Sequence, residues 1–149
     1  MGNRARIIEE TRVLMNEHGA QSIGTTQIAE ALKISPGNLY YHFKNKEEIV
    51  RILFDEVEQG LRDLVKDGNM TKPRGRNGFR SVALNTWLVW TNWIRYKQTI
   101  SPTQLVTREN LAEGVTQIFD VLNPYLDPDF ERAARRVLMR DLSTRSTDG

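Results

Sequence analysis

A short segment, residues 36–43, carries side chains that can form hydrogen bonds with DNA. The amide of Asn38 is of the kind that pairs with a base edge in the major groove. Tyrosine hydroxyls and a histidine imidazole can reach phosphate oxygens, and a glycine permits a close approach of the backbone. The residues concerned are Gly37, Asn38, Tyr40, Tyr41 and His42. The chemistry they indicate is non-covalent recognition of nucleic acid.

Lys46 stands just after this segment, at the start of the next predicted helix. The open N-terminus of a helix presents backbone N–H groups without intrahelical partners, and these favour an anion. An ammonium group at the same place adds a full positive charge. We therefore expect Lys46 and the helix start to clamp a phosphate.

Other chemistries find little support. The chain has no cysteine, which excludes disulfides, thiolate metal sites and a cysteine nucleophile. His42 has only His18 as a companion histidine, which gives little basis for a catalytic or metal role. Glycine-rich phosphate loops and Ser-His-Asp arrangements are not evident. We expect a protein that is not an enzyme and needs neither a cofactor nor a metal.

Apolar residues recur with helical spacing, and no stretch alternates as a strand would, so the sequence predicts an all-α protein. Helices are expected at residues 4–18, 25–32, 36–43 and about 45–67. Gly19 ends the first, and Gly24 or Thr25 caps the second. Ser35 caps the third, with Pro36 in its first position. The second and third helices have the dimensions of a helix-turn-helix, whose second helix enters the major groove.

The rest of the chain divides into a linker and three further helices. Residues 68–78 are polar, glycine-rich and basic, which predicts a loop. Helices are expected at 79–100, 107–123 and 129–142. The first of these is apolar nearly all round, which predicts that it is buried.

The charge is unevenly distributed, although the net charge is only +2. Residues 1–67 hold nine Lys or Arg against eleven Asp or Glu, whereas residues 68–78 hold three basic residues and no acid. DNA binding by the first segment would depend on individually placed donors rather than on a broadly basic surface.

The helix-turn-helix segment resembles the tetracycline-repressor-like (TetR) family over roughly residues 4–55. The likeness rests on Gly19, on Thr25-Thr26-Gln27-Ile28-Ala29, and on Ile34-Ser35-Pro36-Gly37-Asn38-Leu39-Tyr40-Tyr41-His42-Phe43-Lys44-Asn45-Lys46-Glu47-Glu48-Ile49. The resemblance implies DNA contacts at Thr25, Thr26, Ser35, Gly37, Asn38, Tyr40, Tyr41, His42 and Lys46. The two threonines can serve equally as helix caps. The resemblance also implies a homodimer, repression, and an inducing ligand held by the C-terminal helices.

The expected organisation is a DNA-binding domain at 1–48, a connecting helix at about 45–67, a linker at 68–78 and a shortened regulatory and dimerisation domain at 79–149. Members of the family usually carry two additional helices where the linker stands. The last two helices keep apolar stripes that could form a four-helix bundle across a two-fold axis. The stripe of the helix at 107–123 comprises Leu111, Val115, Ile118 and Leu122. That of the helix at 129–142 comprises Ala133, Ala134, Val137 and Leu138.

A ligand pocket is expected between the helix at 79–100 and the C-terminal end of the connecting helix. The residues expected to line it are Asn85, Trp87, Trp90, Asn92 and Trp93. The tryptophans would supply apolar surface and the asparagines a few hydrogen-bonding groups, as is usual in small-molecule sites. The alternative interpretation of the three tryptophans is that they form core.

These features predict a sequence-specific transcriptional regulator: a ligand-responsive repressor that binds a palindromic double-stranded operator as a homodimer. The alternative is a dimeric DNA-binding protein with no small-molecule response. No apolar run is long enough to span a bilayer, and no secretory h-region follows the first methionine, so a cytoplasmic location is expected.

Overall fold

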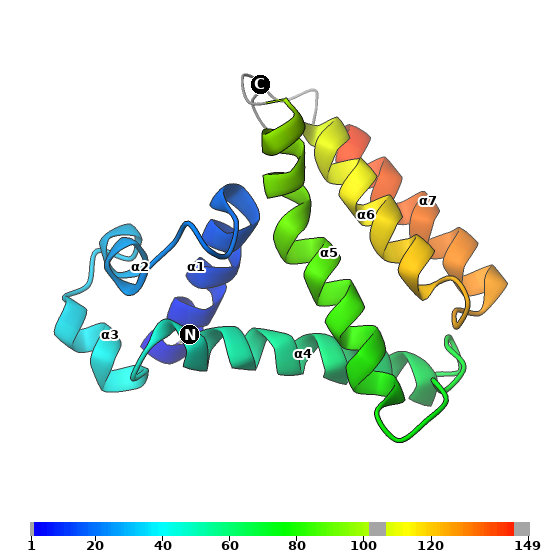
Figure 1. Cartoon of the computed structure of the whole chain (residues 1–149), viewed down its shortest axis with the longest axis horizontal. Coiled ribbons are helices and arrows are strands. Elements are labelled where there is room, and N and C mark those ends of the chain that lie inside the picture. The colour runs from blue at the N-terminus through cyan, green and yellow to red at the C-terminus, as the bar shows by residue number, and fades with distance from the viewer. Residues whose placement is uncertain (1, 102–106, 145–149) are drawn as a thin grey trace.

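The computed structural model describes residues 2–101 and 107–144, and within these ranges the chain forms seven helices and no strand (Figure 1). They are α1 (Asn3–His18), α2 (Thr25–Ala31), α3 (Pro36–His42), α4 (Lys46–Lys66), α5 (Gly78–Ile100), α6 (Arg108–Leu122) and α7 (Pro128–Thr144). Helices α1–α3 form a head at one end of α4. From the other end α5 returns beside α1, and α6 and α7 lie on its far side. The predicted all-α fold is confirmed.

Local signals set the ends of the head helices. Gly19 ends α1 with φ 82°, a left-handed conformation that glycine adopts without strain. Gly24, rather than Thr25, precedes α2, and its N–H donates to the side chain of Gln27 at 2.7 Å. At α3, the Ser35 hydroxyl accepts from the backbone N–H of Asn38 at 3.1 Å. These contacts satisfy N–H groups that lack intrahelical partners.

The head and α4 share one apolar core. Its fully buried side chains come from all four elements and include Ile7, Ile28, Leu39, Phe43, Ile49 and Leu53. Since α4 supplies two of them, its N-terminal half is part of the head's core. The start of α4 therefore cannot move freely relative to α3.

A second core joins the far end of α4 to α5, α6 and the segment between α4 and α5. The segment at 68–78, predicted as a linker, is held in place by contacts with the turn between α6 and α7. Met70 is buried and forms an isolated β-bridge with Leu126, and the Thr71 N–H donates to the Tyr125 carbonyl at 2.7 Å. The turn between α6 and α7 thus fixes the first half of the segment.

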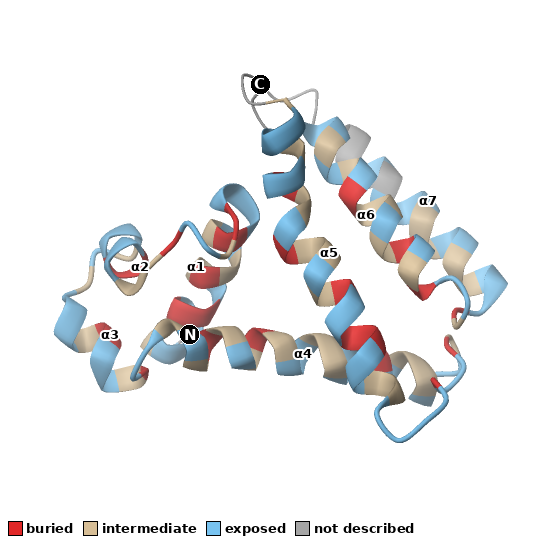
Figure 2. Ribbon diagram, viewed as in Figure 1, coloured by how far each residue is buried: buried red, intermediate tan, exposed pale blue. Residues whose placement is uncertain are grey.

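The prediction that the helix at 79–100 is buried all round was wrong. Helix α5 packs on α1, α4 and α6, but exposed residues remain along it (Figure 2). They include Leu84, Leu88 and Tyr96, and Leu88 is 50% exposed. Helix α7 packs on α6 rather than over these residues of α5. Within the described ranges, no helix is both long and apolar enough to cross a membrane.

Candidate nucleic-acid interface

Helix α3 is anchored by its apolar side and presents its polar side to solvent. Leu39 and Phe43 are each 1% exposed and lie in the head core. Tyr40 and Tyr41, between them in the sequence, are 53% and 84% exposed. A large exposed aromatic side chain on a short, well-anchored helix is available for a partner.

The hydroxyls of Thr25 and Tyr40 lie 3.1 Å apart, and either can be the donor. This contact joins the first residue of α2 to the middle of α3. It orients the Tyr40 ring toward the start of α2. Thr26 next to it is exposed. The two helices therefore present one continuous surface.

Asn38 forms an intramolecular hydrogen bond that its position in the sequence does not predict. It is half-buried, and its Oδ1 accepts a long hydrogen bond of 3.4 Å from Nδ2 of Asn3 in α1. Its own side-chain NH₂ group keeps its donors. Asn38 can therefore still offer hydrogen bonds to an acceptor on a base or a phosphate.

Gly37 lies in the first turn of α3 and is exposed. A Cβ at this position would come no nearer to its surroundings than 3.9 Å, to Ser35 Oγ. The fold itself therefore does not require glycine here, which leaves the space open to a partner. His42, at the other end of α3, is half-buried, and its ring meets that of Tyr41 edge-on, with centroids 5.1 Å apart.

Lys46 has an intramolecular role that the sequence did not indicate. Its Nζ donates to the carbonyls of Ala20 and Ile23, at 3.0 and 2.8 Å, in the segment between α1 and α2. An ammonium group has three N–H donors, so one remains for a phosphate. Lys46 thus ties the start of α4 to the segment that leads into α2.

Arg4 is a second basic residue beside α3. Its position in the sequence does not indicate a place near the DNA-binding surface. Its guanidinium lies 5.1 Å from the centre of the Phe43 ring. Arg4 is exposed, and Asn3, the residue before it, contacts Asn38 of α3. Packing of α1 on α3 brings these residues together, and their separation in the sequence gives no sign of it.

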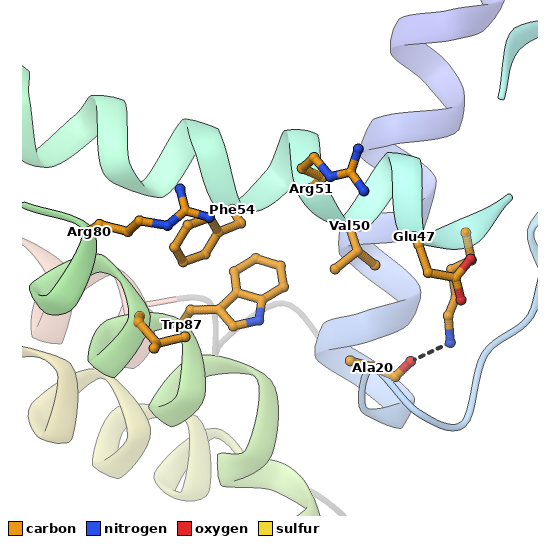
Figure 3. A pocket seen from close by; sticks show the side chains of 9 residues that line it. Ala20, Glu47, Val50, Arg51, Phe54, Arg80 and Trp87 are labelled. Carbon is orange, nitrogen blue, oxygen red and sulfur yellow. Dashed lines mark hydrogen bonds between the residues drawn. The ribbon is translucent and has the colours of Figure 1, made fainter. Parts of the chain in front are cut away.

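The structure does not gather the five expected ligand residues around one cavity. Trp87 lines a groove of about 450 Å³ between α4 and α5, where it faces Phe54 with ring centroids 5.9 Å apart (Figure 3). This groove lies beside the N-terminal half of α4, whereas the expected pocket was at its C-terminal end. Asn85 is exposed, and the Asn92 amide donates to the Leu88 carbonyl of its own helix at 2.9 Å.

Trp90 and Trp93 face α6 instead. Both line a smaller cavity of about 260 Å³. Trp93 Nε1 donates to the carbonyl of Asn110 at 2.6 Å, and the indole lies against Gly114, where a Cβ would be 2.6 Å from Trp93 Cδ1. These contacts describe close packing between α5 and α6.

The fold and this surface define a helix-turn-helix protein with a helical C-terminal part. Two family models match the chain: "Bacterial regulatory proteins, tetR family" over residues 7–53, and "Bacterial transcriptional repressor" over residues 44–134. The second alone covers more than half of the chain. The chain belongs to the TetR family of bacterial transcriptional regulators, which are DNA-binding proteins.

Two curated relatives each match less than half of the chain. The HTH-type transcriptional regulator UidR of Escherichia coli K12 is 36% identical over 59 residues, which are 39% of this chain and 30% of UidR. The HTH-type transcriptional repressor KstR2 of Rhodococcus jostii is 32% identical over 71 residues, 45% of this chain and 35% of KstR2. The matched part thus spans about a third of these relatives.

One solved structure, a TetR-family transcriptional regulator from Marinobacter aquaeolei VT8, is 24% identical to the chain. It aligns over 95% of this chain and 98% of that one, with a TM-score of 0.42.

Proposed function

We propose that this protein is a sequence-specific repressor that places α3 in the major groove of its operator. The observation that carries the proposal is the anchored helix α3, whose buried Leu39 and Phe43 hold the exposed Tyr40 and Tyr41 toward solvent. Membership in the TetR family supports the same function. A helix held this rigidly can present several donors in a fixed geometry.

Each surface residue has a proposed role. The free NH₂ group of Asn38 contacts a base edge or a neighbouring phosphate. The Tyr41 hydroxyl and the third N–H of Lys46 bind phosphates, which position the head without reading sequence. Six others contribute to the same surface: Thr25, Thr26, Ser35, Gly37, Tyr40 and His42. The turn that contains Gly37 allows the DNA backbone to come close.

The protein acts as a homodimer on a palindromic operator. Leu111 of α6 and Val137 and Leu138 of α7 are exposed apolar residues, and the two helices pack on each other. Burial of such side chains against a second copy would stabilise a two-fold pair. A dimer with two recognition helices would bind half-sites roughly 34–36 Å apart in the simplest case.

A small-molecule response would use the groove between α4 and α5. Its walls are largely apolar, from Val50, Phe54, Leu84 and Trp87, and at one end it reaches Lys46 and Ala20 (Figure 3). An apolar ligand there would contact both the head and α5. It would release DNA if it prefers the arrangement in which the two recognition helices are wrongly spaced.

The fluorescent dye 1-anilinonaphthalene-8-sulfonate can test this groove as an apolar probe. Val50→Trp fills the groove and is expected to weaken dye binding about tenfold. Val89→Trp makes the same change on α5 at a residue that does not line this groove, and it is expected to have little effect. Equal dye binding by both variants and the wild type would contradict the ligand site and favour a DNA-binding protein without a small-molecule response.

Selection of bound duplexes from a random DNA pool tests the DNA-binding function itself. The wild type is expected to enrich a palindrome. Tyr41→Ala should retain much less DNA than the wild type at the same protein concentration, because a phosphate contact is lost. Tyr96→Ala, which removes an exposed tyrosine from α5, should retain as much DNA as the wild type and enrich the same palindrome. Retention of DNA by Tyr41→Ala equal to that of the wild type would contradict the assigned surface.

A further inference from the structure

A polar cavity of about 470 Å³ lies at the end of α4 opposite the recognition helix. The residues that line it come from the last turns of α4, the basic segment before α5 and the first turn of α5. The charged residues that line it are Glu58, Arg62, Lys72, Arg76 and Arg80. Its volume lies in the range of small-molecule sites, roughly 300–1,000 Å³.

The cavity has a large excess of positive charge. Four basic side chains face one carboxylate, that of Glu58. Glu58 lies 2.5 Å from Arg62 and 3.6 Å from Arg80, so these two guanidinium groups share a single acid. Lys72 and Arg76 are exposed, and neither forms an ion pair within residues 2–101 and 107–144. A bound anion would neutralise part of this positive charge.

The walls of the cavity are held in place. The Arg62 guanidinium lies 4.4 Å from the centre of the Phe79 ring as well as against Glu58. Pro73 is buried, and its carbonyl lies so close to the start of α5 that a Cβ at Gly78 would be 2.6 Å from it. A donor that is already positioned, as Arg62 is, loses less entropy when a ligand binds.

We propose that this cavity binds a small molecule that carries two or more phosphate charges. Guanidinium groups match phosphate oxygens with paired, charge-assisted hydrogen bonds, and the lysine adds a point charge. A concave site of this size suits a compact anion better than a duplex. Arg62 is also 16 residues along α4 from Lys46, or about 24 Å at the usual rise of a helix, and so lies away from the helix-turn-helix surface.

Calorimetric titration of the full chain with inorganic pyrophosphate tests the proposal. The wild type is expected to show saturable binding. Lys72→Gln and Arg76→Gln should each weaken it about tenfold, as expected for loss of a charge-assisted hydrogen bond. Arg74→Gln is the matched control, because Arg74 lies in the same segment but does not line the cavity, and it should change the affinity less than twofold.

Gly78→Ala tests the shape of the site without a change of charge. The added methyl group would displace Pro73 and should weaken pyrophosphate binding at least as much as Arg76→Gln, while circular dichroism remains that of the wild type. Absence of saturable binding, or equal losses in Lys72→Gln, Arg76→Gln and Arg74→Gln, would overturn the proposal.

A role for this cavity in DNA binding would also overturn the proposal. It would appear as competition between pyrophosphate and a short duplex, with equal losses of both affinities in Arg76→Gln. The helix-turn-helix function is measured separately, through Tyr41→Ala, so failure of the anion site leaves the proposed repressor function untouched.

Discussion

The ammonium group of Lys46 lies 2.8 Å from the carbonyl oxygen of Ile23, which joins the first residue of α4 to the segment that leads into α2. Ile23 is buried in the head core, so this contact links a surface cation to a fixed part of the backbone. Displacement of α4 would therefore be transmitted to α2 and α3. The same lysine lines the groove between α4 and α5, so it connects the proposed ligand site to the DNA-binding head.

Lys46→Ala is expected to lower the free energy of unfolding by about 2 kcal/mol, because two carbonyl groups lose a charged donor. It should also reduce the magnitude of the salt dependence of DNA binding by about one unit, since one phosphate contact is lost. Urea unfolding and salt titrations measure the two effects. Lys44→Ala is the control for stability, because the Lys44 side chain is exposed and forms no hydrogen bond or ion pair with the described residues. Unchanged stability in Lys46→Ala would refute the structural role of the lysine.

Ser35→Ala removes the hydroxyl that caps α3 and should destabilise the protein by about 1 kcal/mol. DNA affinity should fall as well, because the first turn of α3 then loses its fixed geometry. Ser22→Ala changes an exposed serine for which no side-chain hydrogen bond is found, and it should leave both quantities unchanged. Thermal unfolding and fluorescence anisotropy with labelled duplex give the comparison. Equal behaviour of the two variants would count against the cap.

Gly114→Ala places a methyl group against the indole of Trp93 and should destabilise the protein by about 1–3 kcal/mol. Gly60→Ala is the opposite case. Gly60 lies inside α4, a Cβ there would meet nothing within 4 Å, and alanine should stabilise the helix by about 0.5–1 kcal/mol. Denaturant unfolding of the two variants gives both values. A stabilising Gly114→Ala would show that α5 and α6 are not closely packed at Trp93.

Leu138→Glu places a charge in the exposed apolar surface of α7 and should convert the proposed dimer to a monomer. Leu88→Glu makes the same change at a residue of similar exposure on α5, 50% against 41% for Leu138, and should leave the dimer intact. Sedimentation equilibrium at micromolar concentration distinguishes the two species. A monomer formed by Leu88→Glu and a dimer retained by Leu138→Glu would move the interface to α5.

The helices of the head could be predicted because their end signals are local. Ser35, Pro36 and Gly19 act on residues within one turn, so a single sequence reveals them. The burial of α5 could not be predicted, because an apolar helix surface does not indicate whether a neighbour covers it. The packing of Trp93 on Gly114 and the contacts of Lys46 join segments that are distant in the chain, and they follow from the tertiary arrangement alone.

The most direct measurement is the affinity of the wild type and Tyr41→Ala for the selected palindrome and for a scrambled duplex of equal length. The wild type is expected to prefer the palindrome by about 1,000-fold or more. Tyr41→Ala is expected to bind both duplexes more weakly while its helical content is unchanged. Equal affinity of the wild type for the two duplexes would contradict sequence-specific recognition by α3.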